Sequence, residues 1–433
     1  MDRRALLRSA VLTGVAASGL AVTAEPIAAS ALQPAAKPDK AKGPDTRNIR
    51  YTQWTSTADF ATGTAAGVGT AGDVLTFQSA ADQTSYTDPV LGTTGTYEFA
   101  TWTSPSAAVG FTATQAVASW TADTPAGTFV KVELRGTTAG GTTTGWYVMG
   151  IWAADDANVS RTSVNGQSDA NGSISTDTLV AASGGGLTSI QLRVSLLRPA
   201  GSGSIPKVRS IGVMASALPT TVTASSPAGA QGVVLGVPQF SQQIHAGQYP
   251  QFGGGGEAWC SPTSTSMVVA FWGQGPTATD YSWVDPSYAD PWIDYAARNA
   301  YDYAYGGTGN WPFNTAYAGR FGLDGFITRL RSLNEAEQFI AAGIPLVLSL
   351  SFKKNQIPGL TYGTNGHLLV LAGFSATGDP VLNDPFSPSD AEVRKTVGRS
   401  AFEAAWLTTS GGTTYVITPA GRALPARPAQ PNW

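Results

Sequence analysis

The chain of 433 residues contains one cysteine and two histidines. A single cysteine cannot form a disulfide within the chain, and so few thiol and imidazole groups make a zinc site of the usual kind hard to build. Charged residues amount to only 13% of the sequence and the formal net charge is −3, which gives no basic surface for nucleic acid. Neither a Walker-type phosphate loop nor a His-Glu-x-x-His motif is present. We therefore expect no cofactor, no metal and no nucleic-acid partner.

Residues 1–31 have the features of a bacterial export signal. Arg3 and Arg4 precede a short apolar stretch, as in twin-arginine signals, and small residues that suit a cleavage site follow it. The stretch is short for a bilayer span and Arg8 interrupts it, so we expect no membrane span once the signal is removed. Residues 32–49 then form a Pro/Ala/Lys spacer. The protein is expected outside the cell or at its envelope, where a leftover cysteine is either inert and buried or kept for chemistry.

Residues 50–218 show short strand patterns separated by Gly, Thr, Asn and Asp. In TFVKVELRGTT apolar and charged residues alternate, whereas TGWYVMGIWAA at 144–154 is apolar on both faces and predicts a central strand. Several such strands with turn signals between them, and no helical pattern, predict an all-β sandwich of jelly-roll type. We expect Trp120, Trp146 and Trp152 in its core.

Two roles are open for this β domain. The first is to stabilise the protein, and the second is to bind a cell-wall glycan, because such sandwiches often present aromatic, Arg and Asp side chains on one face. The loop SRTSVNGQSDANGS at 160–173 supplies four side chains for contact with a sugar or a calcium ion, namely Arg161, Asn165, Asp169 and Asn171. Calcium is disfavoured because the dense spacing of oxygen ligands that it needs is missing.

A linker at 219–232 precedes a second domain of mixed α and β pattern at 233–420, and a C-terminal tail follows at 421–433. Four glycines in this second domain lead to Cys260. Pro262 and an apolar stripe that ends at a glycine predict a helix starting at or just after the cysteine. The start of a helix favours a thiolate, and a glycine-rich approach lets substrate come close to the backbone.

A thiolate nucleophile needs a base and a group that orients the base. His245 lies in the polar stretch SQQIHAGQYPQ and is expected at the surface, whereas His367 opens the apolar strand GHLLVLAGF. The turn SATGDP and a second strand VLNDP follow, so that a hairpin returns Asp384 to within diagonal reach of His367. Cys260, His367 and Asp384 would then be nucleophile, base and orienting carboxylate. A histidine at the start of a buried strand also has a purely structural interpretation.

The segment from Val233 to about Thr418 resembles the papain-fold cysteine peptidases akin to the bacteriocin-processing, double-glycine-leader peptidases. The pieces that carry the resemblance, in the family's order, are VPQFSQ, WCSPTSTSMVVAFWG, GIPLVLSLSF, GHLLVLAGF, LNDP and FEAAWLTTSGGTTYVITP. The resemblance implies an α+β papain-like fold. It also implies a glutamine upstream of the cysteine that helps form the oxyanion hole, and Gln242 holds the matching place.

Two features depart from the family pattern. Ser261 stands where the family usually has glycine, and the stretch between Gln242 and Cys260 is longer than expected. Other glutamines near this stretch therefore remain alternatives for the oxyanion role, namely Gln239, Gln243, Gln248 and Gln251.

Candidate substrate contacts lie beside the cysteine and in a later polar loop. Trp259 and Ser261 flank Cys260, and the loop GTGNWPFNT at 307–315 carries Asn310 and Trp311, whose ring is either tucked inside or part of the cleft wall. The sequence thus predicts an exported cysteine peptidase acting on a peptide or protein. The alternatives are a cell-wall amidase, endopeptidase or thiol acyltransferase with a glycan-binding β domain, and a surface binding protein whose peptidase domain is degenerate.

Overall fold

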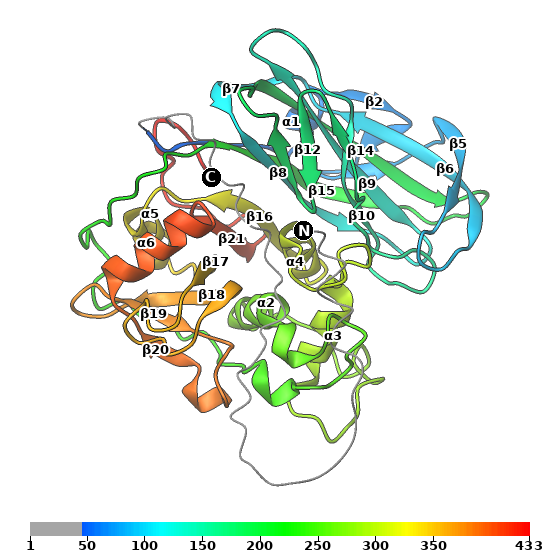
Figure 1. Ribbon diagram of the computed structural model, residues 1–433. Coiled ribbons are helices and arrows are strands. Elements are labelled where there is room, and N and C mark those ends of the chain that lie inside the picture. Colours follow the sequence, from blue (N-terminus) through cyan, green and yellow to red (C-terminus); the bar gives the residue numbers. More distant parts are fainter. Residues whose placement is uncertain (1–45) are drawn as a thin grey trace, which may run out of the picture.

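The computed structural model describes residues 46–433, so the predicted signal at 1–31 and most of the predicted spacer lie outside the described residues. The described chain has two domains (Figure 1): the N-terminal one is mostly β, and the second contains most of the helices. None of the helices between residues 46 and 433 has both the length and the apolar character needed to cross a membrane.

The N-terminal domain consists of two antiparallel sheets whose inner faces share one core. The eight-stranded sheet has the order β11 (Ser168–Asp169), β12 (Gly172–Ser175), β13 (Thr178–Ala181), β8 (Gln115–Asp123), β15 (Lys207–Ala217), β4 (Leu75–Phe77) and β3 (Val68–Thr70), and β1 (Asn48–Trp54) also pairs with β15. The seven-stranded sheet has the order β10 (Tyr147–Trp152), β9 (Phe129–Thr138), β14 (Leu187–Pro199), β6 (Thr94–Thr103) and β2 (Thr64–Ala66), with β5 (Asp82–Thr87) on β6 and β7 (Ala107–Ala113) on β14. The short helix α1 (Thr57–Phe60) follows β1.

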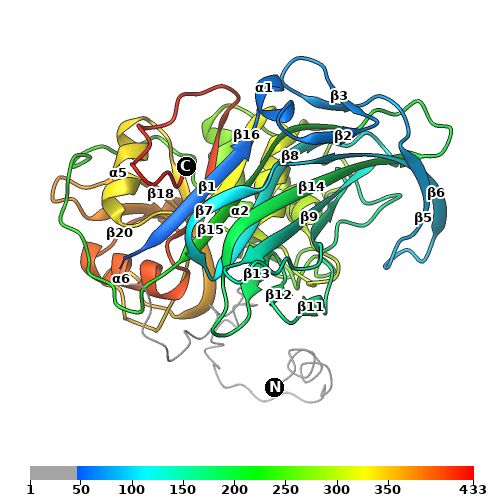
Figure 2. The same ribbon diagram turned by 90° about the horizontal axis from the view of Figure 1, so that it is seen from above.

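The second domain is built on a six-stranded antiparallel sheet. Its order is β16 (Leu323–Arg329), β21 (Thr413–Pro419), β17 (Leu346–Phe352), β18 (Thr364–Phe374), β19 (Pro380–Asn383) and β20 (Arg394–Thr396). The helices are α2 (Cys260–Phe271), α3 (Pro291–Ala300), α4 (Trp311–Gly319), α5 (Leu333–Ala341) and α6 (Arg399–Thr409), with 3-10 turns η2 (Gln243–His245), η3 (Gly256–Ala258) and η4 (Asp390–Glu392). Figures 1 and 2 show α2 on one side of the sheet and α5 and α6 on the other.

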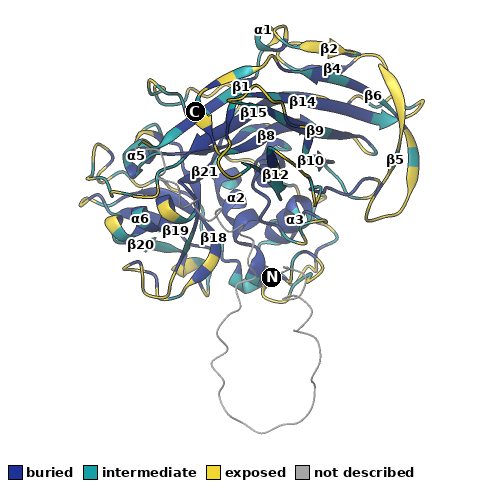
Figure 3. Ribbon diagram, turned by 45° about the horizontal axis from the view of Figure 1, so that its top comes forward, coloured by how far each residue is buried: buried dark blue, intermediate teal, exposed yellow. Residues whose placement is uncertain are grey.

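Strand β9 confirms the alternation expected for TFVKVELRGTT. Val130, Val132 and Leu134 are completely buried between the sheets, while Lys131 and Arg135 point to the other face and are partly exposed. Alternate burial of this kind follows from the two-residue period of a strand. Figure 3 shows the contrast with β5, which lies at the outside of the domain and is largely exposed.

Strand β10 is at the edge of its sheet, which corrects the expectation of a central strand. The second domain helps to cover this strand, since Trp152 packs against Phe313 of α4 with 5.5 Å between ring centroids. At Val148 the Gln167 side chain takes the place of a neighbouring strand. The backbone N–H of Val148 donates to this side chain at 2.7 Å, and the carbonyl of Val148 accepts from it at 2.8 Å. A strand that is apolar on both faces can therefore be an edge strand when another domain covers it.

The three tryptophans expected in the sandwich core have two different environments. Trp120 and Trp152 are completely buried, as predicted, but Trp146 is only partly buried. The guanidinium groups of Arg135 and Arg193 lie 4.4 and 4.5 Å from the centre of the Trp146 ring. Cation–π contacts with two arginines thus replace the core packing that we expected for this residue.

The two domains share their cores. Tyr51 of β1 stacks on Phe326 of β16 with 4.6 Å between ring centroids. Helix α4 packs against both β8 and β16, and its Phe313 contacts Trp120 at 6.1 Å. Because these contacts are apolar and buried, we expect the domains to unfold together.

The loop at 160–173 joins the domains, which corrects the assignment of Arg161 as a sugar contact, whereas sugar binding by the other named side chains stays a prediction. Arg161 is completely buried and donates to the carbonyls of Ala153 and Ala154 at 3.0 and 3.3 Å and to that of Arg298 at 2.8 Å. Asn165 also crosses the boundary, since its amide donates to a carbonyl of the second domain at 3.2 Å.

The other two of the four named side chains, Asp169 and Asn171, have separate environments. Asp169 accepts backbone N–H groups from Gly145 and Asn171 at 2.9 and 2.7 Å, so its carboxylate shapes the turn. The contact with Asp169 involves the backbone N–H of Asn171 and not its side chain.

We expect Arg161→Ala to destabilise the protein by about 3–5 kcal/mol, as breaking a buried ionic contact does. The change removes the hydrogen bonds that the guanidinium donates to three backbone carbonyls. It also removes the positive charge that lies 3.6 Å from the carboxylate of Asp156. Urea unfolding followed by tryptophan fluorescence measures the loss. The partly exposed Arg135→Ala is the matched control and should cost about 1 kcal/mol or less. Equal midpoints for the two variants would contradict the bridging role of Arg161.

The linker at 219–232 is held against the second domain. Backbone N–H and hydroxyl groups of Ser225 donate to Glu403 at 2.6 and 2.9 Å, and the N–H of Ala228 donates to Glu337 at 2.8 Å. These carboxylates lie on α6 and α5, so the linker is fixed over the helices that cover the sheet.

The segment 421–433, predicted as a tail, is also packed into the fold. Trp433 is 1% exposed and contacts Phe339 with 5.1 Å between ring centroids. The carbonyl of Pro431 accepts the N–H of Tyr51 in β1 at 2.9 Å, and Figure 2 shows the C-terminal segment near this strand. The last residues therefore fasten β1 to the second domain.

Candidate active site

The four glycines before the cysteine are explained by backbone geometry. Gly253, Gly254 and Gly255 have φ angles of 88°, 109° and 115°, a region that favours glycine. A Cβ on Gly256 would lie 2.3 Å from the carbonyl oxygen of Gln242. The run thus forms a tight turn that packs closely on the chain around Gln242 and brings it to the start of α2.

Cys260 is the first residue of α2, as predicted, and is 5% exposed. All residues of the helix from Cys260 to Val269 are buried, so α2 is a central helix. Ser264 donates its hydroxyl to the carbonyl of Leu368 in β18 at 3.1 Å. This contact fixes the first turns of α2 on the strand that carries His367.

The hairpin of β18 and β19 brings His367 and Asp384 together. Val370 pairs with Asn383, so Asp384 follows directly after the paired part of β19. The Nε2 atom of His367 lies 2.8 Å from Oδ1 of Asp384, and the Cys260 thiol is near enough to the imidazole to raise its pKa. The predicted return of the chain is therefore confirmed, although β18 begins at Thr364.

The electrostatics of the pair favour a charged imidazole. Burial by itself lowers the pKa of His367, but the hydrogen bonds and charges of Asp384 and Cys260 outweigh it and raise this pKa to about 9. Burial by itself raises the pKa of Asp384, but the hydrogen bond and charge of His367, together with Lys395, lower this pKa to about 2. At neutral pH the pair is thus an imidazolium beside a carboxylate.

Asp384 has three further partners, two of which are side chains that the sequence analysis did not single out. The hydroxyl of Tyr362 donates to its two oxygens at 3.1 and 3.0 Å, and the ammonium of Lys395 donates at 3.1 Å. The N–H of Phe386 completes the set at 3.1 Å. Burial and the nearby carboxylate raise the pKa of Tyr362 well above its usual value, so its hydroxyl remains a donor.

Only the sheet register could have pointed to Lys395. It pairs with Leu382, which is two residues before Asp384 and on the same face of the strand. Tyr362 precedes β18 and reaches the carboxylate through a loop, for which the sequence has no periodic signal. These two side chains hold the Asp384 carboxylate in place beside the His367 ring.

Gln242 lies between the two halves of the site. Its amide donates to the carbonyls of Gly256 and Glu257 at 2.9 and 2.8 Å, and its backbone N–H donates to Pro385 at 2.9 Å. Both amide hydrogens are engaged, so binding an oxyanion requires Gln242 to exchange one of these bonds. Its role in the oxyanion hole stays a prediction.

The other glutamines have different surroundings. Gln239 accepts the N–H of Arg394 at 3.0 Å, and Gln248 bonds to His245 at 2.9 Å. Gln251 is exposed, whereas Gln243 is half-buried. Gln242 is the member of the group that is bonded both to the turn before Cys260 and to the residue after Asp384.

The residues beside Cys260 have interior partners. The Ser261 hydroxyl lies 3.0 Å from that of Tyr415, and both side chains are buried. The serine that replaces the family's glycine therefore points into the core. Trp259 is also buried and donates its indole N–H to the carbonyl of Phe252 at 2.7 Å. A substrate contact for Trp259 or Ser261 stays a prediction.

The stretch 307–315 is not the polar loop that we expected, because α4 begins at Trp311. The side chain of Asn310 caps this helix by accepting the N–H of Phe313 at 3.2 Å, and its amide donates to Asp302 at 2.9 Å. Trp311 is 6% exposed, in line with the tucked alternative. A role for Asn310 and Trp311 in the cleft stays a prediction.

His245 is completely buried, which corrects its assignment to the surface. Its Nδ1 lies 3.2 Å from Asp294 and 2.9 Å from Gln248, and its ring is 6.2 Å from that of Trp259. The polar sequence around His245 predicted a surface position, but the glycine turn 253–256 packs over this segment. His245 thus supports the turn, while His367 contacts the thiol.

Comparison with known families matches both domains. Residues 50–216 match the model of the Peptidase C39 N-terminal domain, and residues 234–414 match that of the Peptidase C39 like family. No curated protein matches the chain. Among residues 46–433 there is no group of three or more His, Cys, Asp or Glu side chains that could hold a metal ion. The second matched range contains Cys260 and His367, and the chain is a C39 cysteine peptidase-like protein with an N-terminal domain.

Proposed function

We propose that the protein is a cysteine peptidase that hydrolyses peptide bonds of a peptide or protein. The observation that carries the proposal is the position of the buried His367 ring between the Cys260 thiol and Asp384. We also propose that the second domain is papain-like and the first a jelly-roll sandwich. The central helix that starts at Cys260 and the two packed antiparallel sheets support these assignments.

We propose further that the protein is exported by a twin-arginine signal and acts outside the cell or at its envelope. The support comes from the sequence at 1–31. A single cysteine suits such a location, because it cannot be consumed by an internal disulfide.

The first half of the reaction transfers the acyl group to the enzyme. The Cys260 thiolate attacks the scissile carbonyl carbon, and the carbonyl electron pair moves onto oxygen. As first residue of α2, Cys260 has a backbone N–H with no acceptor inside the helix, and this group and the Gln242 amide would bind the oxyanion. The intermediate collapses, the C–N bond breaks, and the His367 imidazolium protonates the leaving amine.

The second half releases the acyl group. Neutral His367 takes a proton from water, the hydroxide attacks the thioester, and the C–S bond breaks to give an acid and the thiolate. Asp384 bonds to Nε2 of His367 and leaves Nδ1 for the proton transfers. An amine in place of water would give acyl transfer from the same thioester, and an amidase would hydrolyse a cell-wall amide by the same two steps. Mass spectrometry of the products distinguishes these outcomes.

Alkylation of the thiol tests the proposal without a known substrate. Iodoacetamide should label the folded protein at mildly acidic pH, because the His367 imidazolium stabilises the thiolate. His367→Ala should slow labelling about tenfold or more, read by mass spectrometry over time. Above about pH 9 the imidazolium is lost, in keeping with the raised pKa of His367, and this advantage should disappear.

The matched control is His245→Ala, which removes the other histidine; because His245 supports the turn before Cys260, labelling of the folded variant should fall far less than in His367→Ala. An inert core cysteine would behave in the opposite way. It would react only after unfolding, and at equal rates in the wild type and His367→Ala. That result would also support the degenerate binding protein over the peptidase.

A further inference from the structure

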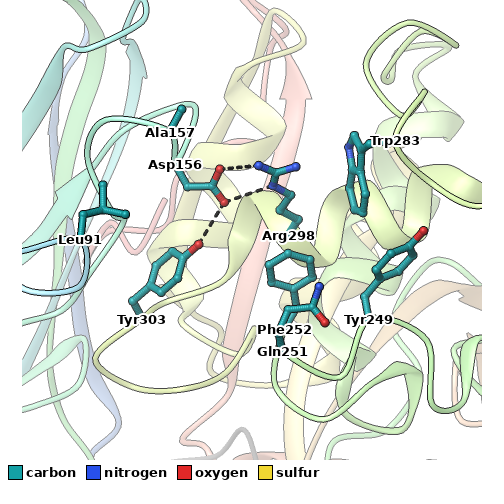
Figure 4. Close-up of a pocket in the computed structure, with 9 residues that line it drawn as sticks. All are labelled: Leu91, Asp156, Ala157, Tyr249, Gln251, Phe252, Trp283, Arg298 and Tyr303. Atoms are coloured by element: carbon teal, nitrogen blue, oxygen red, sulfur yellow. Dashed lines mark hydrogen bonds and ion pairs between the residues drawn. The ribbon is translucent and has the colours of Figure 1, made fainter.

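A pocket of about 440 Å³ lies at the boundary between the two domains. Leu91 and Asp156 come from the β domain, whereas Phe252, Trp283 and Arg298 come from the second domain (Figure 4). Its size is in the range of small-molecule sites, which run from about 300 to 1,000 Å³, and exceeds what one side chain needs. No residue of the proposed triad lines it.

The second domain supplies an aromatic wall. The ring of Trp283 is 5.0 Å from that of Tyr249 and 6.3 Å from that of Phe252. The Arg298 guanidinium lies 5.1 Å from the centre of Trp283 and so holds this ring from another side. On the β-domain side, Leu91 is a large apolar residue that is 43% exposed. The pocket thus has an aromatic surface on one side and the apolar side chain of Leu91 on the other.

An ion pair lies between these walls, as Figure 4 shows. Asp156 accepts from Nη2 and Nε of Arg298 at 2.8 and 3.2 Å and from the hydroxyl of Tyr303 at 3.0 Å. These bonds use two of the five N–H donors of Arg298, whose side chain is 35% exposed. Covering this pair with a purely apolar group would be costly, because its remaining polar groups would lose water.

We propose that this pocket binds a saccharide that carries N-acetyl groups. A sugar ring has an apolar face for Trp283, and its hydroxyls replace water at the Asp156–Arg298 pair. The acetamido carbonyl accepts a remaining N–H of Arg298, while its methyl group contacts apolar side chains such as Leu91. Asp156 is also 3.6 Å from the completely buried Arg161, so the exposed N–H donors at the pocket belong to Arg298. The aromatic side chain of a bound peptide would instead displace water from the ion pair without replacing its hydrogen bonds.

The pocket is connected to the proposed active site through one short segment. The carbonyl of Phe252 accepts the indole N–H of Trp259, the residue directly before Cys260. A saccharide bound against Phe252 would thus be positioned by the same turn that carries the cysteine. The binding itself is independent of the proposed peptidase activity, so either one can fail alone.

The test is a titration of the full chain carrying Cys260→Ala, in which binding is observed without turnover. N,N′,N″-triacetylchitotriose should bind, as measured by calorimetry and by a change in tryptophan fluorescence. Trp283→Ala should weaken binding at least tenfold, and Gln251→Ala, which removes an exposed amide at the rim, should weaken it a few-fold. Trp146→Ala changes a partly exposed tryptophan outside the pocket and is the matched control, with no effect expected.

Three results would overturn the assignment. The first is no binding to the folded protein at millimolar saccharide, and the second is equal affinity of the parent and Trp283→Ala. The third is binding of N-acetyl-phenylalanine amide at this pocket with no binding of the saccharide, which would identify a subsite for a peptide side chain. Thermal unfolding of each variant shows whether it is folded. If Trp283→Ala does not fold, the affinity of Gln251→Ala still tests the assignment.

Discussion

Replacement of Cys260 by alanine should lower kcat/KM for peptide hydrolysis by about 10⁴-fold or more, because no thioester can then form. Cys260→Ser should lose nearly as much, since a hydroxyl is a far weaker nucleophile in a site built for a thiolate. Cleavage of a quenched-fluorescence peptide library measures the loss.

The fold should survive these replacements. The thiol is small and lies at the start of α2, with 5% of the residue exposed, so its loss removes little packing. Thermal unfolding of Cys260→Ala and wild type should therefore agree closely. Retained hydrolysis by a stable Cys260→Ala protein would show that the sulfur takes no part in the reaction.

Replacement of Asp384 by asparagine should lower kcat/KM by about 10³- to 10⁴-fold. Its amide can donate to Nε2 of His367, which forces the proton onto Nδ1 and leaves no acceptor facing Cys260. Because Asp384, together with Cys260, raises the pKa of His367 to about 9, the alkaline limb of the pH–rate profile should also move to lower pH. Iodoacetamide labelling should fall less than turnover, since alkylation needs no proton transfer to a leaving group.

Tyr362→Phe is the graded comparison for this change. It removes one hydroxyl from Asp384 and keeps the bonds from His367, Lys395 and Phe386, so we expect a loss of about tenfold in kcat. The pH profile should keep its position because the carboxylate remains. An Asp384→Asn variant as active as Tyr362→Phe would contradict the orienting role of the carboxylate.

The sequence predicted elements with strong local signals. Glycines followed by a cysteine, a proline and an apolar stripe are local features, and α2 begins where they indicate. The hairpin that returns Asp384 to His367 follows from two apolar strands and a short turn, because antiparallel pairing is set by turn length and alternation. The two domains and the change near residue 219 were visible in composition for the same reason.

Burial at the domain boundary could not be predicted, because it depends on which surfaces meet. Arg161 was a candidate sugar contact but is completely buried, and Trp146 was expected in the core but is only partly buried. His245 lies in a polar segment, yet the glycine turn covers it. In each case the neighbour that decides burial is distant in sequence, and local patterns contain no information about it.

The sequence by itself determined the kind of chemistry available: one thiol at a helix start, one histidine on an apolar strand and one aspartate after the next strand. Only the tertiary structure decided how those groups are held. Tyr362 and Lys395 reach Asp384 from a loop and a separate strand, and the interdomain pocket needs walls from both domains. The physical reason is that periodicity and capping act over a few residues, whereas side-chain contacts depend on how the whole chain packs.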